Sequence, residues 1–458
     1  MKKRFGLWIA IALIISVLVG LVGCAGANEG ENAGASDSDP EASGSGEESV
    51  TASDVEIAGD RETVEFWYLW GGDEEKAILE AIDLYNSSQD KYFVKGTMCD
   101  MQKQTAGMAG TSGPDITDII DVNVSGLASS GAVENLTPYI ERDGFDTSEF
   151  NNAAMQLCEY EGELYGLPLN AMSNMVYYNK AALDEAGITE LPETMEELMD
   201  VAIKLTKFDE EGNIIQLGWP WINDPTPVDF LTLANNFGAT WISEDGQTIT
   251  CDEEAVIAAY QYMLEYMDAV GKEKVQQFIA SYGTAKSTSE DPLFTGKQAL
   301  RIDGMYLTNL ITSNGYNLDD FGVFGLPYWE ERPELEGIQT ITSSIFIIPK
   351  NANNKEGAWD FIKWIHSDEG MTFIDSRFQN EASRSSLINN EELKAANPLY
   401  EEFIESGAKN PVPRFPSVKN SDTYINELNS ATDAVFNGSS TPEEAMRQVK
   451  EKMNSLIK

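Results

Sequence analysis

The chain has 458 residues and a formal net charge of −45, with 31 Lys and Arg against 76 Asp and Glu. This charge excludes a nucleic-acid partner, because binding to a phosphate backbone requires a surplus of cationic side chains. A single histidine and four widely spaced cysteines also argue against a zinc site or a disulfide scaffold.

The N-terminal residues 1–23 have the three parts of a secretory signal peptide. Cations at positions 2–4 precede an apolar stretch, and the sequence LVGC at residues 21–24 resembles a bacterial lipobox. We therefore expect cleavage before Cys24, whose thiol would carry acyl chains such as palmitate and anchor the exported protein to the outer face of the cell membrane. The alternative is a retained transmembrane anchor, which needs about 20 apolar residues and which this stretch only marginally allows.

Residues 24–62 form the next segment, which begins with the expected lipidated Cys24 and consists mainly of Gly, Ser, Ala and acidic residues. Such a segment cannot bury enough apolar surface to offset the entropy of folding, so we expect a disordered acidic linker. The chain from residue 63 onward is too long for one ordinary core and suits two domains.

The segment from residue 63 to residue 130 alternates strands with helices. Residues 63–70, TVEFWYLW, are an uninterrupted β-prone run, and an amphipathic helix is expected at 74–88. The next expected elements are a strand at 92–98, a helix at 101–109, a strand at 117–120 and a helix near 125–130. This pattern favours parallel sheets covered by helices on both faces, with ligands bound at the carboxyl ends of the strands.

The run from residue 165 to residue 206 carries the strongest local signals. A compact apolar and aromatic strand at 175–178 is followed by a short helix that Gly187 ends. A second helix begins after Thr194, which caps it, and Glu197 completes a capping box.

The remaining chain continues with elements of both kinds. Strands are expected at 214–219, 321–327 and 342–349, and helices at 227–237, 252–270 and 355–365. The last helix begins at Pro442, after the capping residue Thr441.

The ordered motifs of residues 165–206 resemble the signature of extracellular solute-binding proteins (family 1, sugar-binding type) that serve ATP-binding-cassette (ABC) importers. The shared elements are Gly-Leu-Pro at 166–168, Tyr-Asn-Lys at 178–180, Ala-Gly at 186–187 and Pro-x-Thr-x-x-Glu-Leu at 192–198. Met195 replaces a tryptophan that is usual in the family. Shorter matches at 113–116, 136–139, 294–300 and 382–384 extend the resemblance over nearly everything after residue 63. The alternative is an arbitrary strand-helix-helix unit of some α/β enzyme.

This resemblance implies an α/β, two-lobe, periplasmic-binding-protein-like (type II) fold with a ligand cleft between the lobes. Three hinge crossovers are expected near residues 170–173, 300–303 and 338–343. Lobe 1 would contain residues 63–170 and 304–340, and lobe 2 would contain residues 171–303 and 341–458. Closure of the lobes about the hinge would enclose the ligand.

A sugar has apolar ring faces and an equator of hydroxyl groups, so its site needs an aromatic platform surrounded by polar side chains. By the resemblance, Tyr306 stands where many members have a sugar-stacking tryptophan and is the preferred platform. The other ligand-binding candidates are Trp70, Asp121, Asn123, Asn170, Trp219, Trp221 and Arg384. For the aromatic candidates the alternative role is core packing. For the acidic candidates it is a helix cap, and for Arg384 it is an exposed salt bridge.

The resemblance implies a receptor that captures a carbohydrate, with an oligosaccharide as the favoured ligand, and delivers it to the permease of an ABC importer. We expect a monomer that is not an enzyme and uses no cofactor or metal. One alternative is a receptor for a polyol, a peptide or another small solute. Another is a lipid-anchored glycoside hydrolase, which needs only two carboxylates at a set separation.

We expect structural rather than catalytic roles for the histidine and the cysteines of the folded part. His366 follows a helix at 355–365 and is expected to be its end residue. Cys99, Cys158 and Cys251 are expected to be buried free thiols, and at most one pair of them could form a disulfide.

Overall fold

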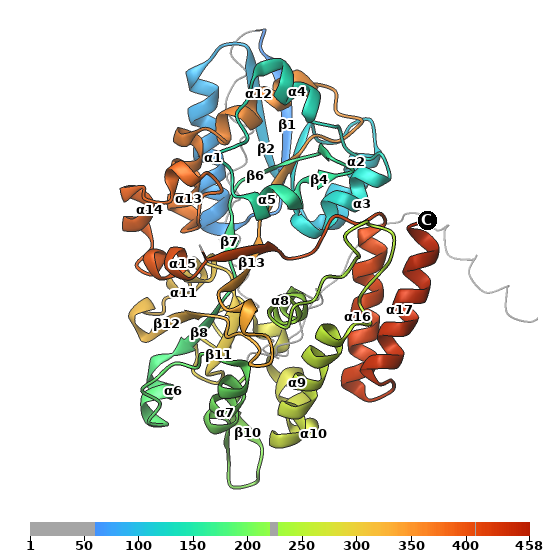
Figure 1. The fold of residues 1–458 in the computed structure, drawn as a ribbon. Coiled ribbons are helices and arrows are strands. Elements are labelled where there is room, and N and C mark those ends of the chain that lie inside the picture. The colour runs from blue at the N-terminus through green and yellow to red at the C-terminus, as the bar shows by residue number, and fades with distance from the viewer. Residues whose placement is uncertain (1–59, 220–227, 408) are drawn as a thin grey trace, which may run out of the picture. The chain divides into compact units, whose positions relative to one another are not determined.

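A five-stranded sheet organises the first part of the computed structural model, which describes residues 60–219, 228–407 and 409–458 (Figure 1). Its strand order is β2-β1-β3-β14-β6. The strands are β1 (Glu62–Tyr68), β2 (Tyr92–Met98), β3 (Ile116–Ile120), β14 (Ser344–Ile347) and β6 (Leu167–Pro168). Strand β1 pairs in parallel with β2 and β3, whereas β14 is antiparallel to β3 and β6. The expected parallel arrangement therefore holds for the first three strands.

Helices pack against this sheet and complete its core. They include α1 (Gly72–Ser88), α12 (Lys355–Ile365) and α13 (Asp368–Phe378). Their apolar faces bury residues such as Ile78 and Phe361 against Phe66 and Phe346 of the strands. His366 caps the C-terminal end of α12, as expected.

A second sheet has the strand order β11-β8-β12. Its strands β11 (Leu300–Asp303), β8 (Met175–Asn179) and β12 (Phe321–Gly325) are antiparallel, so the expectation of parallel sheets is wrong here. Its core is shared with helices α7 (Met195–Leu205), α8 (Val228–Asn236), α9 (Glu254–Val270), α16 (Ser421–Asn437) and α17 (Pro442–Leu456).

A small third sheet joins the two larger ones. It has the order β15-β13-β7 and consists of β15 (Asn410–Pro413), β13 (Ile338–Thr342) and β7 (Met172–Ser173). Strand β7 lies between β6 and β8 in the sequence, and β13 lies between β12 and β14. Two of the expected crossovers, at 170–173 and 338–343, therefore fall in this hinge sheet.

The third crossover was placed wrongly at 300–303. Strand β11 occupies these residues and pairs with β8 along its whole length, inside the second sheet. The chain instead returns after α13. It runs beside residues 169–173, continues through α14 (Glu391–Ala396), which contacts α13, and reaches α15 (Tyr400–Gly407), which contacts β12.

Strand pairing also corrects the expected lobe boundaries. Residues 304–340 were expected in lobe 1, but β12 belongs to the second sheet. Residues 341–458 were expected in lobe 2, but β14 belongs to the first sheet, and α12 and α13 pack on the elements of that sheet. Only the C-terminal helices α16 and α17 join the second core as expected. Strands β12 and β14 are both short apolar runs. Their local sequences do not determine which sheet each strand joins, because this depends on partners that are distant in the chain.

Shorter elements complete the described chain. They are η2 (Asp121–Asn123), α2 (Met101–Ala109), α3 (Val124–Ser129), α4 (Thr137–Asp143), α5 (Asn152–Leu157), β4 (Glu159–Tyr160), β5 (Glu163–Leu164), α6 (Lys180–Glu185), β9 (Lys207–Phe208), β10 (Ile214–Gln216), α10 (Lys272–Tyr282), η3 (Gly283–Ala285), α11 (Leu307–Ser313), η4 (Leu318–Asp320), η5 (Pro333–Leu335) and η6 (Ser385–Leu387). None of the described helices has the length and apolar character needed to span a membrane.

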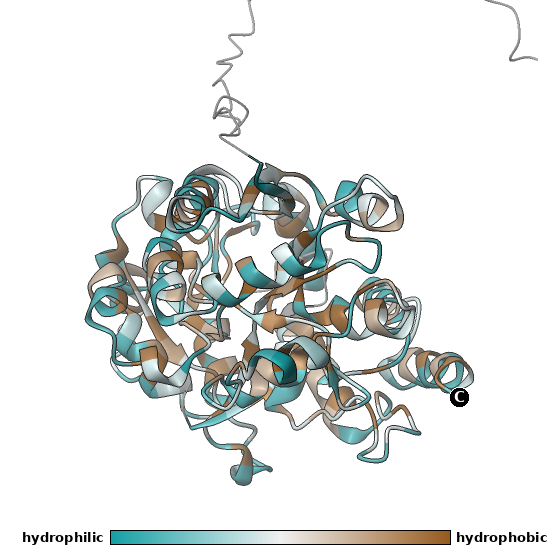
Figure 2. Ribbon diagram, turned by 90° about the horizontal axis from the view of Figure 1, so that it is seen from above, coloured by the Kyte–Doolittle hydropathy of each residue, from teal (hydrophilic) through white to brown (hydrophobic). Residues whose placement is uncertain are grey.

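The predicted helix caps are present. The Thr194 hydroxyl accepts a hydrogen bond from the Glu197 N–H at 3.2 Å, and Thr441 caps α17 in the same way. Gly187 has φ of +65°, the left-handed conformation expected after a helix. The helices carry hydrophilic residues on their outward faces (Figure 2), which agrees with the amphipathic patterns that predicted them.

Candidate functional site

The carboxyl ends of β1 and β3 form the first candidate region. Trp70 follows β1 and is half-buried, with its ring centroid 5.3 Å from that of Phe378 and 5.9 Å from that of Phe346. Trp70 therefore closes the top of the first core and leaves part of its ring accessible. The packing role that the sequence left open is therefore observed, and the ligand role of Trp70 stays a prediction.

Two carboxyl groups that were not among the predicted site residues lie near this edge. Asp118 is buried at 3% exposure, and its Oδ1 accepts hydrogen bonds from Leu69 N at 2.9 Å and Gln104 Nε2 at 3.3 Å. Burial, together with a smaller effect of the Glu74 charge, raises the pKa of Asp118 to about 7, although the hydrogen bonds from Leu69 and Gln104 act in the opposite direction. Glu74, in the first turn of α1, also has its pKa raised by burial to about 7. In the sequence, Glu74 is an acid in the first turn of the helix that follows β1, whereas Asp118 is an acid within the apolar run of β3.

Asp121 is buried in an ion pair with Arg414, which directly follows β15. The Arg414 guanidinium donates to Oδ1 of Asp121, and the Ser343 N–H donates to Oδ2 at 3.2 Å. The Val122 N–H adds a hydrogen bond to Oδ1 at 2.7 Å. The carboxylate thus joins η2 to the β13–β14 connection and to the segment after β15.

Asn170 lies at the first crossover and is fully buried. Its Oδ1 accepts a hydrogen bond from the Ser344 N–H at 2.9 Å, and its backbone carbonyl accepts one from the Ser343 hydroxyl at 2.7 Å. Its Nδ2 has no hydrogen-bond partner within the described part of the chain. Asp121 and Asn170 therefore meet through the consecutive residues 343 and 344, and of the two only Asn170 was expected at a hinge.

Asn123 and Arg384 have contrasting surroundings. Asn123 is half-buried at the start of α3, and no side-chain hydrogen bond links it to other described residues. Arg384 is 13% exposed and pairs with Glu149 at 2.5 Å and Asp368 at 3.0 Å, with its guanidinium 5.1 Å from the Phe150 ring centroid. These contacts match the salt-bridge alternative for Arg384, although the Arg384 side chain itself is more buried than expected, while both carboxylates are exposed.

The aromatic candidates of the second lobe are separated from those of the first. Trp219 is 2% exposed in the second core, and its ring is 6.0 Å from that of Tyr262. Trp221 lies outside the described residues. Tyr306 is half-buried at the start of α11. Its ring lies close to Gly304, and a Cβ atom added at Gly304 would lie 3.0 Å from the ring.

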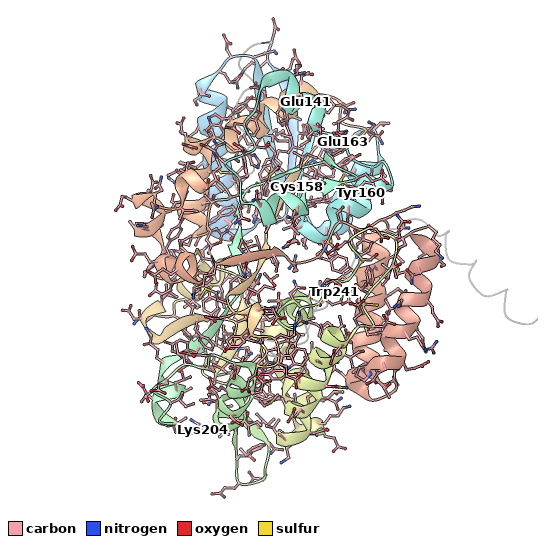
Figure 3. The ribbon with its side chains drawn as sticks, in the orientation of Figure 1. Glu141, Cys158, Tyr160, Glu163, Lys204 and Trp241 are labelled. Atoms are coloured by element: carbon pink, nitrogen blue, oxygen red, sulfur yellow. The ribbon has the colours of Figure 1, made fainter. Side chains whose placement is uncertain are left out.

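A chain of polar contacts connects the second core to the hinge sheet. Trp241, labelled in Figure 3, donates its indole N–H to Asn235 Oδ1 at 2.9 Å. Asn235 in turn donates to Thr340 Oγ1 at 3.2 Å and to the Arg414 carbonyl at 3.1 Å. Neither Trp241 nor Asn235 was among the predicted site residues.

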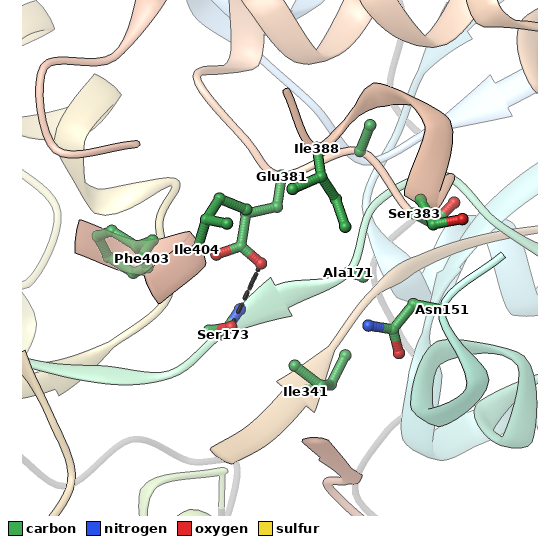
Figure 4. Close-up of a pocket in the computed structure, with 11 residues that line it drawn as sticks. Asn151, Ala171, Ser173, Ile341, Glu381, Ser383, Ile388, Phe403 and Ile404 are labelled. Carbon is green, nitrogen blue, oxygen red and sulfur yellow. Dashed lines mark hydrogen bonds between the residues drawn. The ribbon is translucent and has the colours of Figure 1, made fainter. Parts of the chain in front are cut away.

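A small cavity of about 80 Å³ lies beside the hinge sheet (Figure 4). It is lined by residues from β7, β13, α15 and the segment after α13, including Ala171, Ser173, Ile341, Glu381 and Ile404. Across residues 60–219, 228–407 and 409–458, no group of three or more His, Cys, Asp or Glu side chains could hold a metal ion. Cys99, Cys158 and Cys251 are buried and free, as expected.

Two α/β lobes joined by a small hinge sheet are the architecture of a type II periplasmic binding protein. Residues 100–372 match the bacterial extracellular solute-binding protein family, and this chain belongs to that family. The resemblance and the fold class predicted from the sequence are thereby confirmed.

Several relatives span most of the chain. The diacetylchitobiose binding protein DasA of Streptomyces coelicolor is 23% identical over 409 residues, covering 86% of this chain and 90% of the relative. A putative binding protein of Brucella abortus, BAB2_0491, is 23% identical over 372 residues, covering 78% of this chain and 83% of the relative.

Solved structures show the same fold. The structure of CpMnBP1 with mannotriose bound has a TM-score of 0.74 and 25% identity, covering 86% of this chain and 100% of that one. The GacH receptor of Streptomyces glaucescens, solved unliganded and with acarbose, has a TM-score of 0.71 and 19% identity, covering 87% of this chain and 98% of that one.

Proposed function

We propose that this protein is an exported, non-enzymatic receptor that binds a carbohydrate, with an oligosaccharide as the favoured ligand, and delivers it to an ABC importer permease. The main support is the similarity to CpMnBP1, which covers all of that mannotriose-bound chain. The description of DasA as a diacetylchitobiose binding protein points to the same ligand class.

Ligand capture would proceed by closure about the hinge sheet. A ligand favours the closed form only to the extent that it contacts both lobes better than water does. Trp70, Glu74 and Asp118 would offer a ring face and hydroxyl acceptors from the first lobe, and Tyr306 would offer a second ring face. The unpartnered Nδ2 of Asn170 would provide a donor near the hinge.

The charge of this region favours a neutral ligand over an anionic one. Another relative is the sn-glycerol-3-phosphate-binding periplasmic protein UgpB of Rhizobium meliloti, 23% identical over 325 residues, covering 67% of this chain and 71% of the relative. Carboxyl groups at Glu74 and Asp118 would repel a phosphate. A neutral polyhydroxylated ligand instead donates hydroxyl hydrogens to them.

The ligand class can be tested by calorimetric titration of the purified protein with mannotriose, maltotriose, diacetylchitobiose, ribitol and sn-glycerol-3-phosphate. We expect saturable binding of a sugar and an increase in melting temperature, because a ligand that binds only the folded state stabilises it. Binding of ribitol or glycerol phosphate alone would reject the carbohydrate proposal and keep the receptor proposal. Release of smaller sugars during incubation would favour the glycoside hydrolase alternative.

The lipid anchor is a separate part of this proposal. Cys24 lies outside the described residues, so the support is the lipobox-like sequence at residues 21–24. Cells expressing the full chain should incorporate an alkyne analogue of palmitate into the membrane-associated protein. The Cys24→Ser variant should lose this label, and an equally labelled variant would contradict lipidation at Cys24.

A further inference from the structure

Two acidic side chains are buried at the junction of the lobes. Asp375 lies in α13 with 0% exposure, and Glu381 follows that helix with 5% exposure. Both oxygens of Asp375 and Oε1 of Glu381 lack hydrogen-bond partners among the described residues. An unpaired buried carboxylate is costly, because burial removes its hydration without replacing it.

Glu381 is attached to the first crossover. Its Oε2 accepts hydrogen bonds from both the N–H and the hydroxyl of Ser173, each at 3.3 Å (Figure 4). Its backbone carbonyl accepts a third from the Ala171 N–H at 3.0 Å. The side chain of Glu381 therefore holds β7, the strand about which the lobes connect.

Elements of both lobes surround this carboxyl group. One apolar cluster brings together Met371 of α13, Ala382, Tyr177 of β8 and Phe403 of α15. The cavity beside Glu381 separates it from Ile341 of β13. The negative charge of an ionised Glu381 would therefore act directly on the contact between elements of the two lobes.

No cationic side chain forms an ion pair with Glu381 among the residues that the structure describes. The titratable groups that face it are Asp375 from α13, Tyr177 from β8 and Tyr400 from α15, and all three are acids. Asp303, at the end of β11, raises the pKa of Tyr177 as well. The nearby Arg384 instead pairs with Glu149 and Asp368.

Burial raises the pKa of Glu381 to about 8, although the hydrogen bonds from Ser173 act in the opposite direction. The pKa of Asp375 lies well above its ordinary value, because the group is buried and Glu381 lies nearby.

We propose that Glu381 is a protonation-dependent latch of the hinge, whose neutral form holds the crossover strand in the junction and whose ionisation favours a loosened junction. Ionisation draws water toward the carboxylate, and the adjoining cavity is the space into which water can enter. In the receptor proposed above, ligand affinity would then depend on pH, and this consequence alone rests on the proposed function.

The latch can be tested without ligand by hydrogen exchange of the Ala171 and Ser173 amides in the full chain between pH 6 and pH 8. In the closed form the Glu381 carboxyl ionises only near pH 8, whereas in the loosened form it has its ordinary, lower pKa. A rise in pH between these two values therefore favours opening. The protection factor, corrected for intrinsic exchange, should then fall on the order of tenfold per pH unit and level off above pH 8.

The matched variants are Glu381→Gln and Glu405→Gln. Glutamine keeps an acceptor for Ser173 but cannot ionise, so the protection factor should no longer depend on pH in Glu381→Gln. Glu405 is exposed on α15, and its variant should behave like the wild type. A protection factor that is constant with pH in the wild type, or an equal slope in Glu381→Gln, would overturn the proposal.

Infrared spectroscopy gives a second measurement. The C=O band of a protonated carboxylic acid should be present at pH 6 in the wild type and lose intensity as the pH rises to 9. Because Glu74 and Asp118 also ionise near pH 7, the part of this band that belongs to Glu381 is the difference between the wild type and Glu381→Gln. Absence of any such band at pH 6 would show that Glu381 and Asp375 are already ionised and would reject the latch.

Discussion

The buried pair of Asp121 and Arg414 is the contact on which the hinge depends most at the scale of single residues. Replacing Arg414 by Met should lower the free energy of unfolding by about 3–5 kcal/mol, because Asp121 would remain buried without a counter-charge. The double variant Asp121→Asn with Arg414→Met removes both charges and should recover part of this loss. Denaturant unfolding measures both, and equal losses in the single and double variants would show that charge burial is not the cause.

Tyr306 is the residue whose predicted ligand role can be separated from stability. The Tyr306→Ala variant should bind the sugar identified by titration at least about fivefold more weakly, because loss of a stacked ring removes about 1 kcal/mol or more. Tyr306→Phe retains the ring and should bind nearly as well as the wild type. The melting temperature of the ligand-free protein reports folding. Unchanged affinity in Tyr306→Ala would reject the platform assignment.

At the scale of elements, the capping box of α7 should contribute measurably to the second lobe. Thr194→Ala removes the acceptor for the Glu197 N–H and should lower the free energy of unfolding by about 1 kcal/mol. Thr194→Ser keeps the hydroxyl and should lose much less. If urea unfolding gives the same loss for both variants, the threonine methyl group rather than the cap is responsible.

The elements also show how far sequence reasoning reaches. The caps at Thr194 and Thr441 were predicted because the signals lie within one helical turn. The crossover at 300–303 was wrong, because the partner of β11 is β8, more than a hundred residues earlier in the chain. Asn235 was missed as well, since an amide in a helix acquires its role only from distant contacts.

At the scale of the whole molecule, buried acids should make stability depend on pH in an unusual direction. Burial raises the pKa of Glu381 to about 8 and that of Asp118 to about 7 in the folded state. A group with a raised folded pKa contributes stability that is present below its unfolded pKa and is lost as the pH rises to the folded value. The melting temperature should therefore fall between pH 5 and pH 8.

His366 acts in the opposite direction over part of this range. Burial lowers its pKa to about 4, so its contribution is present above the unfolded pKa and is lost as the pH falls through the folded pKa. Above pH 6.5 the contribution of His366 to stability no longer changes with pH. The fall in melting temperature should therefore be steepest between pH 6.5 and pH 8. The double variant Asp118→Asn with Glu381→Gln should flatten the curve there.

The net charge of −45 provides a competing explanation that salt can separate from the buried acids. Repulsion among exposed carboxylates destabilises the folded state, but it is strongly screened in 1 M salt, where the Debye length is about 3 Å. The desolvation of Asp118 and Glu381 is not screened, because these groups are inside the protein. The fall in melting temperature from pH 6.5 to pH 8 should therefore persist in 1 M NaCl, as calorimetry can show. A curve that becomes flat in salt would assign the pH dependence to the surface charge instead.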